Sequence, residues 1–127
     1  MSISLNAIAQ GYATDLVARY LEGKVNSALV NFGEYRVVGE KAWDVEVVGK
    51  TISVSNALAV SSGSGERLSA TSVANHLIDP RTGESPPPKK VVAVEAPEAW
   101  LADGLATVVA IGGEVPDSFK GVKVYQF

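Results

Sequence analysis

Apolar side chains recur every three or four residues through the first part of the chain. The repeat runs from Leu5 to Leu21 and has the spacing of one face of an α-helix. Ser4 precedes it as a candidate N-cap residue, and Gly23 follows it at a position where helices often end. The pattern predicts an amphipathic helix over residues 5–21.

The middle of the chain changes to short apolar runs and to alternation of apolar and polar residues. Both patterns are typical of β-strands, and glycine-containing turns separate them. The Ser-Gly segment at 62–65 is interpreted as a turn, although its backbone N–H groups are also suited to an anion. The predicted strands, which include a meander through 43–61, cover residues 27–32, 35–38, 43–48, 51–54, 58–61, 71–75, 90–96 and 121–127.

A second helix is predicted after Pro97, because proline fits the first turn of a helix. The pair Gly112-Gly113 is expected to end this helix near Ile111. Four residues are expected to form its apolar face: Leu101, Leu105, Val108 and Ile111.

Asp103 and Thr107 are four residues apart in this helix, so their side chains are expected on one face, one turn apart. A carboxylate and a hydroxyl in this arrangement suit a hard cation such as Mg²⁺, with a substrate phosphate as a further ligand. The alternative is a solvated helix face on which the Thr107 hydroxyl bonds to its own preceding turn. The pair alone favours the alternative.

The order of helix, strands, helix and strand predicts an α+β fold with a largely antiparallel sheet and two main helices packed on it. No internal repeat and no long linker divides the sequence, so we expect a single domain over residues 1–127.

Composition narrows the possible functions. The 127 residues are 46% hydrophobic with a net charge of −3, and no basic cluster exceeds Lys89-Lys90. This argues against nucleic-acid or anionic-membrane binding, although a single phosphate site stays possible. The chain has no cysteine, and His76 is its only histidine, which excludes cysteine-based and histidine-rich metal sites. No signal-peptide pattern or membrane-length apolar run is seen, so a cytoplasmic location is expected.

Asp79 begins a segment with strong turn chemistry. Pro80 fixes its own φ angle, and Gly83 follows three residues later. The Asp79 carboxylate is expected to accept the backbone N–H two residues further on.

Five segments together resemble the ApbE family, the FAD:protein FMN transferases. In chain order they are residues 8–15 (IAQGYATD), 28–34 (ALVNFGE), 62–63 (SG), 76–83 (HLIDPRTG) and 101–107 (LADGLAT). The resemblance spans nearly the whole chain but only the C-terminal part of a typical family member. It therefore implies a T-fold-like ApbE region that lacks the family's N-terminal half.

The resemblance implies an activity and a metal site. Family members use Mg²⁺ and FAD to attach FMN, through its phosphate, to a threonine or serine of a target flavoprotein, and they release AMP. By this resemblance Asp103 and Thr107 are metal ligands, with the Ala106 backbone nearby and the Ala7 carbonyl as a further oxygen. His76 matches the family's proposed catalytic base.

The resemblance also implies contacts with the flavin nucleotide, at Ser4, Gln10, Ile78, Asp79, Arg81 and Thr82. The last four of these lie in or beside the loop expected next to the pyrophosphate, where Arg81 is suited to bidentate phosphate binding. Two structural alternatives stay open. His76 is also suited to donate a hydrogen bond to a backbone carbonyl at a strand end. Arg81 is also suited to form an ion pair with Asp79 or Glu84.

The departures from the family pattern cluster in the flavin-binding parts. Ser4 replaces an aspartate, Gln10 a lysine, Asn6-Ala7 a glycine pair, and Glu34 the second glycine of a further pair. Three interpretations follow: a minimal transferase completed by a partner chain or by self-association, a non-catalytic subunit that binds flavin, nucleotide or metal, and an assembly subunit with a vestigial site. Bare strand edges are expected to be covered, which predicts a homo-oligomer or a complex.

Overall fold

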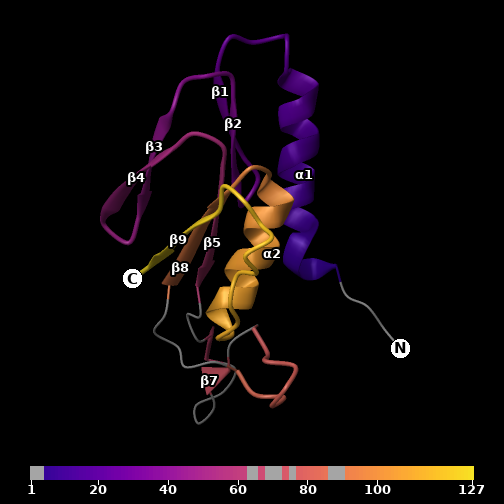
Figure 1. Ribbon diagram of the computed structural model, residues 1–127, viewed down its shortest axis with the longest axis vertical. Helices are drawn as coiled ribbons and strands as arrows, with labels where there is room; N and C mark the ends of the chain where they lie inside the picture. Colours follow the sequence, from indigo (N-terminus) through magenta and orange to yellow (C-terminus); the bar gives the residue numbers. More distant parts are fainter. Residues whose placement is uncertain (1–4, 63–65, 68–72, 75–76, 86–90) are drawn as a thin grey trace.

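The computed structural model describes residues 5–62, 66–67, 73–74, 77–85 and 91–127 (Figure 1). Two helices, α1 (Asn6–Leu21) and α2 (Ala99–Ala110), lie beside a sheet whose strands come from both ends of the chain. The strands are β1 (Ala28–Asn31), β2 (Tyr35–Val38), β3 (Trp43–Val47), β4 (Lys50–Val54), β5 (Ala57–Ser62), β6 (Glu66–Arg67), β7 (Val73–Ala74), β8 (Val91–Ala96) and β9 (Lys123–Gln126).

The main sheet has the order β1-β2-β5-β8-β9, and every neighbouring pair in it is antiparallel. With two helices on one side, this confirms the predicted α+β class with a largely antiparallel sheet. Part of the predicted strand over 71–75 is found as β7, which pairs with β6, and the rest lies outside the described residues.

The hairpin of β3 and β4 corrects the predicted meander. These strands form a sheet of their own and do not continue the main one. Their apolar face, which includes Val45, Val47 and Ile52, packs on the side of the main sheet that carries Val37 and Leu58. Because both faces of the main sheet are apolar, the hairpin covers the side that the helices leave open.

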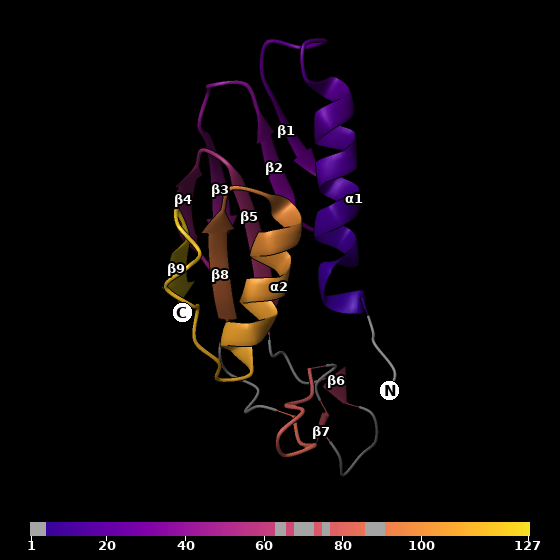
Figure 2. The same ribbon diagram turned by 45° about the vertical axis from the view of Figure 1, so that its right-hand side comes forward.

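The helices cover the other face of the sheet (Figure 2). Small residues of α2, such as Ala102 and Ala106, pack with Leu105 on Val92 and Val94 of β8. The α1 helix packs against β1 and β2, through a cluster of Ala18, Val17, Leu21, Ala28, Val30 and Val38.

The apolar face predicted for α2 is wrong in one member. Val108 is exposed, whereas Ala102, Ala106 and Ala110 are buried. The helix approaches the sheet closely, and this favours small side chains at the contact over large ones.

Candidate functional site

A pocket of about 540 Å³ lies where the start of α1 faces α2 and the end of β5. This volume is within the range of small-molecule sites. The walls come from α1, from the turn between β1 and β2, from β5, from residues 77–78 and from α2. The lining residues are Asn6, Ala7, Gln10, Glu34, Val60, Ser61, Leu77, Ile78, Asp103 and Thr107.

Asp103 and Thr107 both line this pocket from successive turns of α2. Asp103 is half-buried, and its Oδ2 accepts a hydrogen bond of 3.0 Å from the backbone N–H of Gly11. Burial raises the pKa of Asp103, and the hydrogen bond from Gly11 acts in the opposite direction. A ligand with positive charge would favour the ionised carboxylate here.

Glu34 supplies a second carboxyl group to the pocket. The sequence marks this position only as one where glutamate replaces a glycine, and it does not predict Glu34 as a site residue. Glu34 is 5% exposed, and its Oε2 accepts a hydrogen bond of 3.1 Å from the backbone N–H of Val60. Burial, and after it the charge of Asp103, raises the pKa of Glu34 to about 8. The group is therefore largely protonated at neutral pH without a bound cation.

Gly11 and Asp15 of α1 fix the position of α2 and so of Asp103. A Cβ atom at Gly11 would lie 2.3 Å from the carbonyl oxygen of Ala99, so only glycine permits this approach. The Asp15 carboxylate accepts hydrogen bonds from the backbone N–H groups of Ala99 (3.0 Å) and Trp100 (2.9 Å). Asp15 thus caps α2 from another helix, because the side chain of the N-cap residue Glu98 makes no capping bond.

The segment from Asp79 to Glu84 forms a closed loop, and the predicted turn is confirmed. The backbone N–H of Arg81 donates to Asp79 Oδ1 at 2.9 Å, and that of Gly83 donates to the Asp79 carbonyl at 2.8 Å. The backbone N–H of Asp79 in turn donates to the carbonyl of Glu84 at 2.8 Å.

The Arg81 side chain forms an ion pair with Asp79, which is the alternative to phosphate binding that the sequence left open. Its guanidinium binds the Asp79 carboxylate with a shortest distance of 2.8 Å from Nη2 to Oδ2. The same Nη2 donates to the carbonyl of Ile111 at 3.1 Å, so the loop is tied to the end of α2. Hydrogen bonding to Arg81 lowers the pKa of Asp79, which stays ionised.

The structure brings five of the eleven predicted site residues to one place. Ala7, Gln10, Ile78, Asp103 and Thr107 line the pocket. Ala106 lies on the face of α2 that is buried in the core, and it does not line the pocket. Asp79, Arg81 and Thr82 form the adjoining loop without lining the pocket, and Ser4 and His76 lie outside the described residues.

Within the described ranges, no three histidine, cysteine or acidic residues gather closely enough to form a metal site by themselves. The oxygen donors in the pocket fit a cation that is shared with a substrate, because Mg²⁺ is usually held by one or two carboxylates plus substrate phosphates. Neither described helix has the length and apolar character needed to cross a bilayer.

Comparison with known proteins assigns the family. The sequence profile of the ApbE family matches residues 1–118, so the chain belongs to the ApbE family, as the motifs predict. No curated protein matched the chain.

Three solved structures share this fold. The ApbE protein of Thermotoga maritima matches with a TM-score of 0.74 at 25% identity, over 87% of this chain and 41% of that one. The flavin transferase ApbE of Vibrio cholerae matches with a TM-score of 0.69 at 26% identity, over 98% of this chain and 46% of that one. The apo form of the flavinyl transferase ApbE of Pseudomonas stutzeri matches with a TM-score of 0.61 at 25% identity, over 95% of this chain and 46% of that one. The chain therefore spans less than half the length of these relatives.

Proposed function

We propose that this chain carries the metal- and phosphate-facing part of a flavin transferase site. The proposed reaction is the Mg²⁺-dependent transfer of FMN from FAD to a threonine or serine of a target flavoprotein. The observation that carries the proposal is the shared position of Asp103 and Thr107 in one pocket, facing the start of α1, in a member of the ApbE family.

The pocket supplies the oxygen atoms that such a metal needs. Gly11 N–H donates to Oδ2 of Asp103. Ala7 precedes Gly11 by four residues, so its carbonyl is the one that Gly11 N–H would bond in a regular helix. With that N–H directed to Asp103, we assign Asp103, Thr107 and the Ala7 carbonyl as ligands, with the backbone of Ala106 behind them. Bound Mg²⁺ would neutralise charge on the phosphate oxygens.

The reaction also needs a group that takes a proton. The hydroxyl oxygen of the target residue attacks the phosphorus of the FMN half of FAD. The bond from that phosphorus to the bridging oxygen breaks, and AMP leaves with this oxygen. His76 is the proposed acceptor of the hydroxyl proton, because imidazole titrates near neutral pH. Leu77 and Ile78, which follow it in the sequence, line the pocket.

The remaining proposed contacts belong to the flavin nucleotide. Gln10 and Ile78 line the pocket, and Ser4 precedes α1 in the sequence. Asp79, Arg81 and Thr82 are proposed to shape the loop beside the pyrophosphate. Arg81 would act on phosphate only after it releases Asp79, so its present role is to hold this loop against α2.

The test is an assay for transfer. The chain is mixed with FAD, Mg²⁺ and a target flavoprotein domain. AMP release and the mass gain of the target are then measured. The assay is run with the chain alone, with a partner chain added, and under conditions in which two copies of the chain can associate. Asp103→Asn and Thr107→Val are expected to lower turnover by roughly a hundredfold, as loss of one charge-stabilising group does. The matched controls Asp44→Asn and Thr51→Val change exposed residues of the β3–β4 hairpin and are expected to leave it unchanged.

A second candidate function is a non-catalytic subunit that binds flavin, nucleotide or metal. Glu34 favours it, because a buried carboxyl group occupies the pocket where the family pattern has glycine. FAD binding without AMP release would select this function. Absence of both binding and turnover would select an assembly subunit with a vestigial site.

A further inference from the structure

The Glu34 side chain fills a place in the main sheet where a strand would otherwise pair. Glu34 directly precedes β2, which begins opposite Leu58 of β5. Val60 lies two residues beyond Leu58, so its N–H points to the same edge of β5, at a position that β2 does not reach. Oε2 of Glu34 accepts this N–H at 3.1 Å, in place of a strand carbonyl. The carboxyl group therefore occupies a backbone donor on the pocket wall.

The turn that carries Glu34 is held by hydrogen bonds. The Glu34 carbonyl accepts the Phe32 N–H at 3.2 Å and the hydroxyl of Thr14 in α1 at 3.4 Å. The N–H of Gly33 donates to Asn31 Oδ1 at 3.0 Å. With its backbone bonded in this way and only 5% of the residue exposed, Glu34 has a fixed place beside the pocket.

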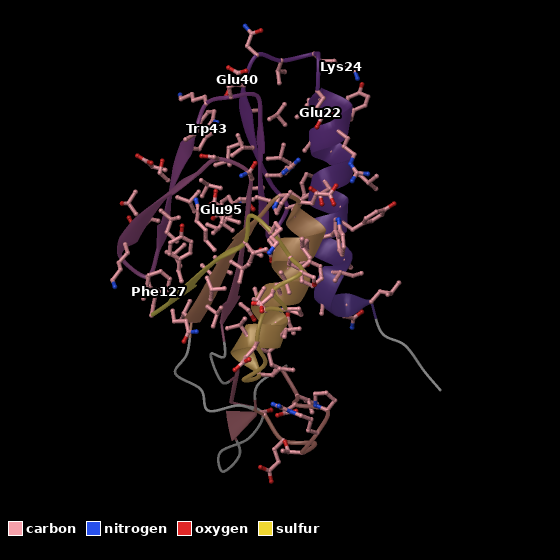
Figure 3. The ribbon with its side chains drawn as sticks, in the orientation of Figure 1. Glu22, Lys24, Glu40, Trp43, Glu95 and Phe127 are labelled. Atoms are coloured by element: carbon pink, nitrogen blue, oxygen red, sulfur yellow. The ribbon has the colours of Figure 1, made fainter. Side chains whose placement is uncertain are left out.

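The second buried glutamate of the described chain has a different environment. Glu95 is 1% exposed, its Oε2 is 2.9 Å from Nζ of Lys123, and its Oε1 accepts the Ser55 N–H at 3.2 Å. Figure 3 shows Glu95 among the strands, apart from α1. Its burial is explained by the ion pair, because a buried carboxylate is normally paired. Glu34 instead bonds a neutral amide and lines a cavity, so an ion pair does not explain its burial.

The position of Glu34 bears on the size of a ligand. In the proposed function, the phosphate of the ligand binds at Asp103 and Thr107 on the α2 wall. Glu34 and Val60 belong to another wall of the same pocket, close enough for the charge of Asp103 to act on Glu34. FAD carries a ring system on each side of its pyrophosphate, whereas a mononucleotide extends from its phosphate in one direction only. A side chain that fills one wall therefore obstructs a dinucleotide more than a mononucleotide.

We propose that Glu34 determines the size of the ligand that the pocket accepts: it favours a metal-bound mononucleotide and disfavours a dinucleotide such as FAD. This rests on the proposed function, which supplies the position of the phosphate. The side chain acts in two ways that do not depend on its charge. It fills the space beside the Val60 amide, and it uses the N–H that an oxygen of a longer ligand would otherwise accept.

The test compares the affinities of three ligands by isothermal titration calorimetry. FAD, ADP and FMN are each titrated, with Mg²⁺, into the parent chain and into Glu34→Ala. The Kd of FAD is expected to fall roughly tenfold in the variant, because a buried N–H becomes available for one hydrogen bond. The Kd values of ADP and FMN are expected to change by less than about threefold. In the parent, ADP or FMN is expected to bind more tightly than FAD.

Two control variants separate space from charge. Glu34→Gln keeps the length of the side chain and an oxygen that can accept the Val60 N–H, so its FAD affinity is expected to match that of the parent. Glu46→Ala, on the exposed face of β3, is the matched control for truncation and is expected to change no affinity. The inference is overturned if FAD binds no more tightly to Glu34→Ala, if all three ligands gain equally, if Glu34→Gln gains as much, or if the parent prefers FAD to both mononucleotides.

Asp103→Asn tests the proposed function separately. Unchanged Mg²⁺-dependent binding in this variant would reject the proposed metal site, whereas the comparison of Glu34→Ala with Glu34→Gln would still decide whether Glu34 restricts the ligand. Either proposal can therefore fail in a way that is distinguishable from failure of the other.

Discussion

Asp15 shows at the scale of one residue how the site is held in place. Its side chain is 2% exposed, and its two oxygens accept the N–H groups of Ala99 and Trp100, with Arg36 Nε 3.5 Å away. The first N–H groups of a helix have no partner within the helix, and that end carries partial positive charge. One carboxylate therefore satisfies two donors of α2 and fixes α1 beside it.

Replacement of this carboxylate should be costly. Asp15→Ala is expected to lower the free energy of unfolding by about 3 kcal/mol, because it removes a cap and leaves Arg36 without its buried partner. Urea denaturation measures this change, and Asp44→Ala on the exposed face of β3 is the control. A loss smaller than about 1 kcal/mol would contradict the capping role.

Val48 is strained, and the strain can be removed. Its φ angle is +52°, which a β-branched residue rarely adopts, and its side chain is exposed in the turn before Gly49. Val48→Asn is expected to raise the free energy of unfolding by about 0.5–1 kcal/mol, because Asn-Gly suits this two-residue hairpin turn. Thermal or urea denaturation tests it against Val48→Ala, which keeps the unfavourable φ angle; equal stabilities of the two variants would refute the explanation.

At the scale of elements, the sequence predicted most helices and strands to within one or two residues. The alternation in 43–48 predicted a half-buried strand, which was placed in a meander through 43–61, but it carried no information on which sheet this strand would join. For the α1 helix, periodicity did not predict which face would be buried. Its periodicity identified an apolar face, whereas the structure packs the face of Gly11 and Ala18 inward. Periodicity shows which residues share a face, and the partners that are present decide which face is buried.

The crossing of α1 and α2 depends on the absence of a side chain at Gly11. Gly11→Ala is expected to lower the free energy of unfolding by about 2–3 kcal/mol, although alanine favours helix by about 1 kcal/mol, because the new Cβ meets the Ala99 backbone. Gly104→Ala is the matched control, since its Cβ would meet only the Ile8 side chain at 3.1 Å. If both variants are equally stable in urea, close backbone contact does not hold the helices.

At the scale of the whole molecule, the sequence predicted the candidate site in part. The spacing of Asp103 and Thr107 placed both in one pocket because helix geometry is local. The environment of Glu34 and the pairing of Arg81 with Asp79 and Ile111 depend on how distant elements pack, and periodicity does not encode that. Ala106 faces the core because small residues of α2 pack against the sheet.

The buried Glu34 makes the stability of the metal-free protein depend on pH. Its pKa is about 8 in the folded protein against 4.5 in the unfolded chain. Between these values the unfolded chain releases the proton and the folded protein keeps it, so stability falls as pH rises from 4.5 to 8. The loss is about 5 kcal/mol at most.

Glu34→Gln tests this dependence, with urea denaturation in EDTA at several pH values. The variant is expected to be more stable than the parent at pH 8, and its stability is expected to fall less with pH. A residual slope of the same sign should remain, since burial also raises the pKa of Asp103. Parallel curves for the two proteins would show that Glu34 is not the titrating group.

The capping of α2 by Asp15 also sets an order of events during synthesis. Asp15 and Ala99 are 84 positions apart in the chain. Ribosomes add roughly 5–20 residues per second, so α1 leaves the ribosome about 4–17 seconds before the amide groups that its carboxylate will hold. Throughout this interval the nascent helix can pack on β1 and β2 but not on α2, and its contacts with α2 form only when the last quarter of the chain has emerged.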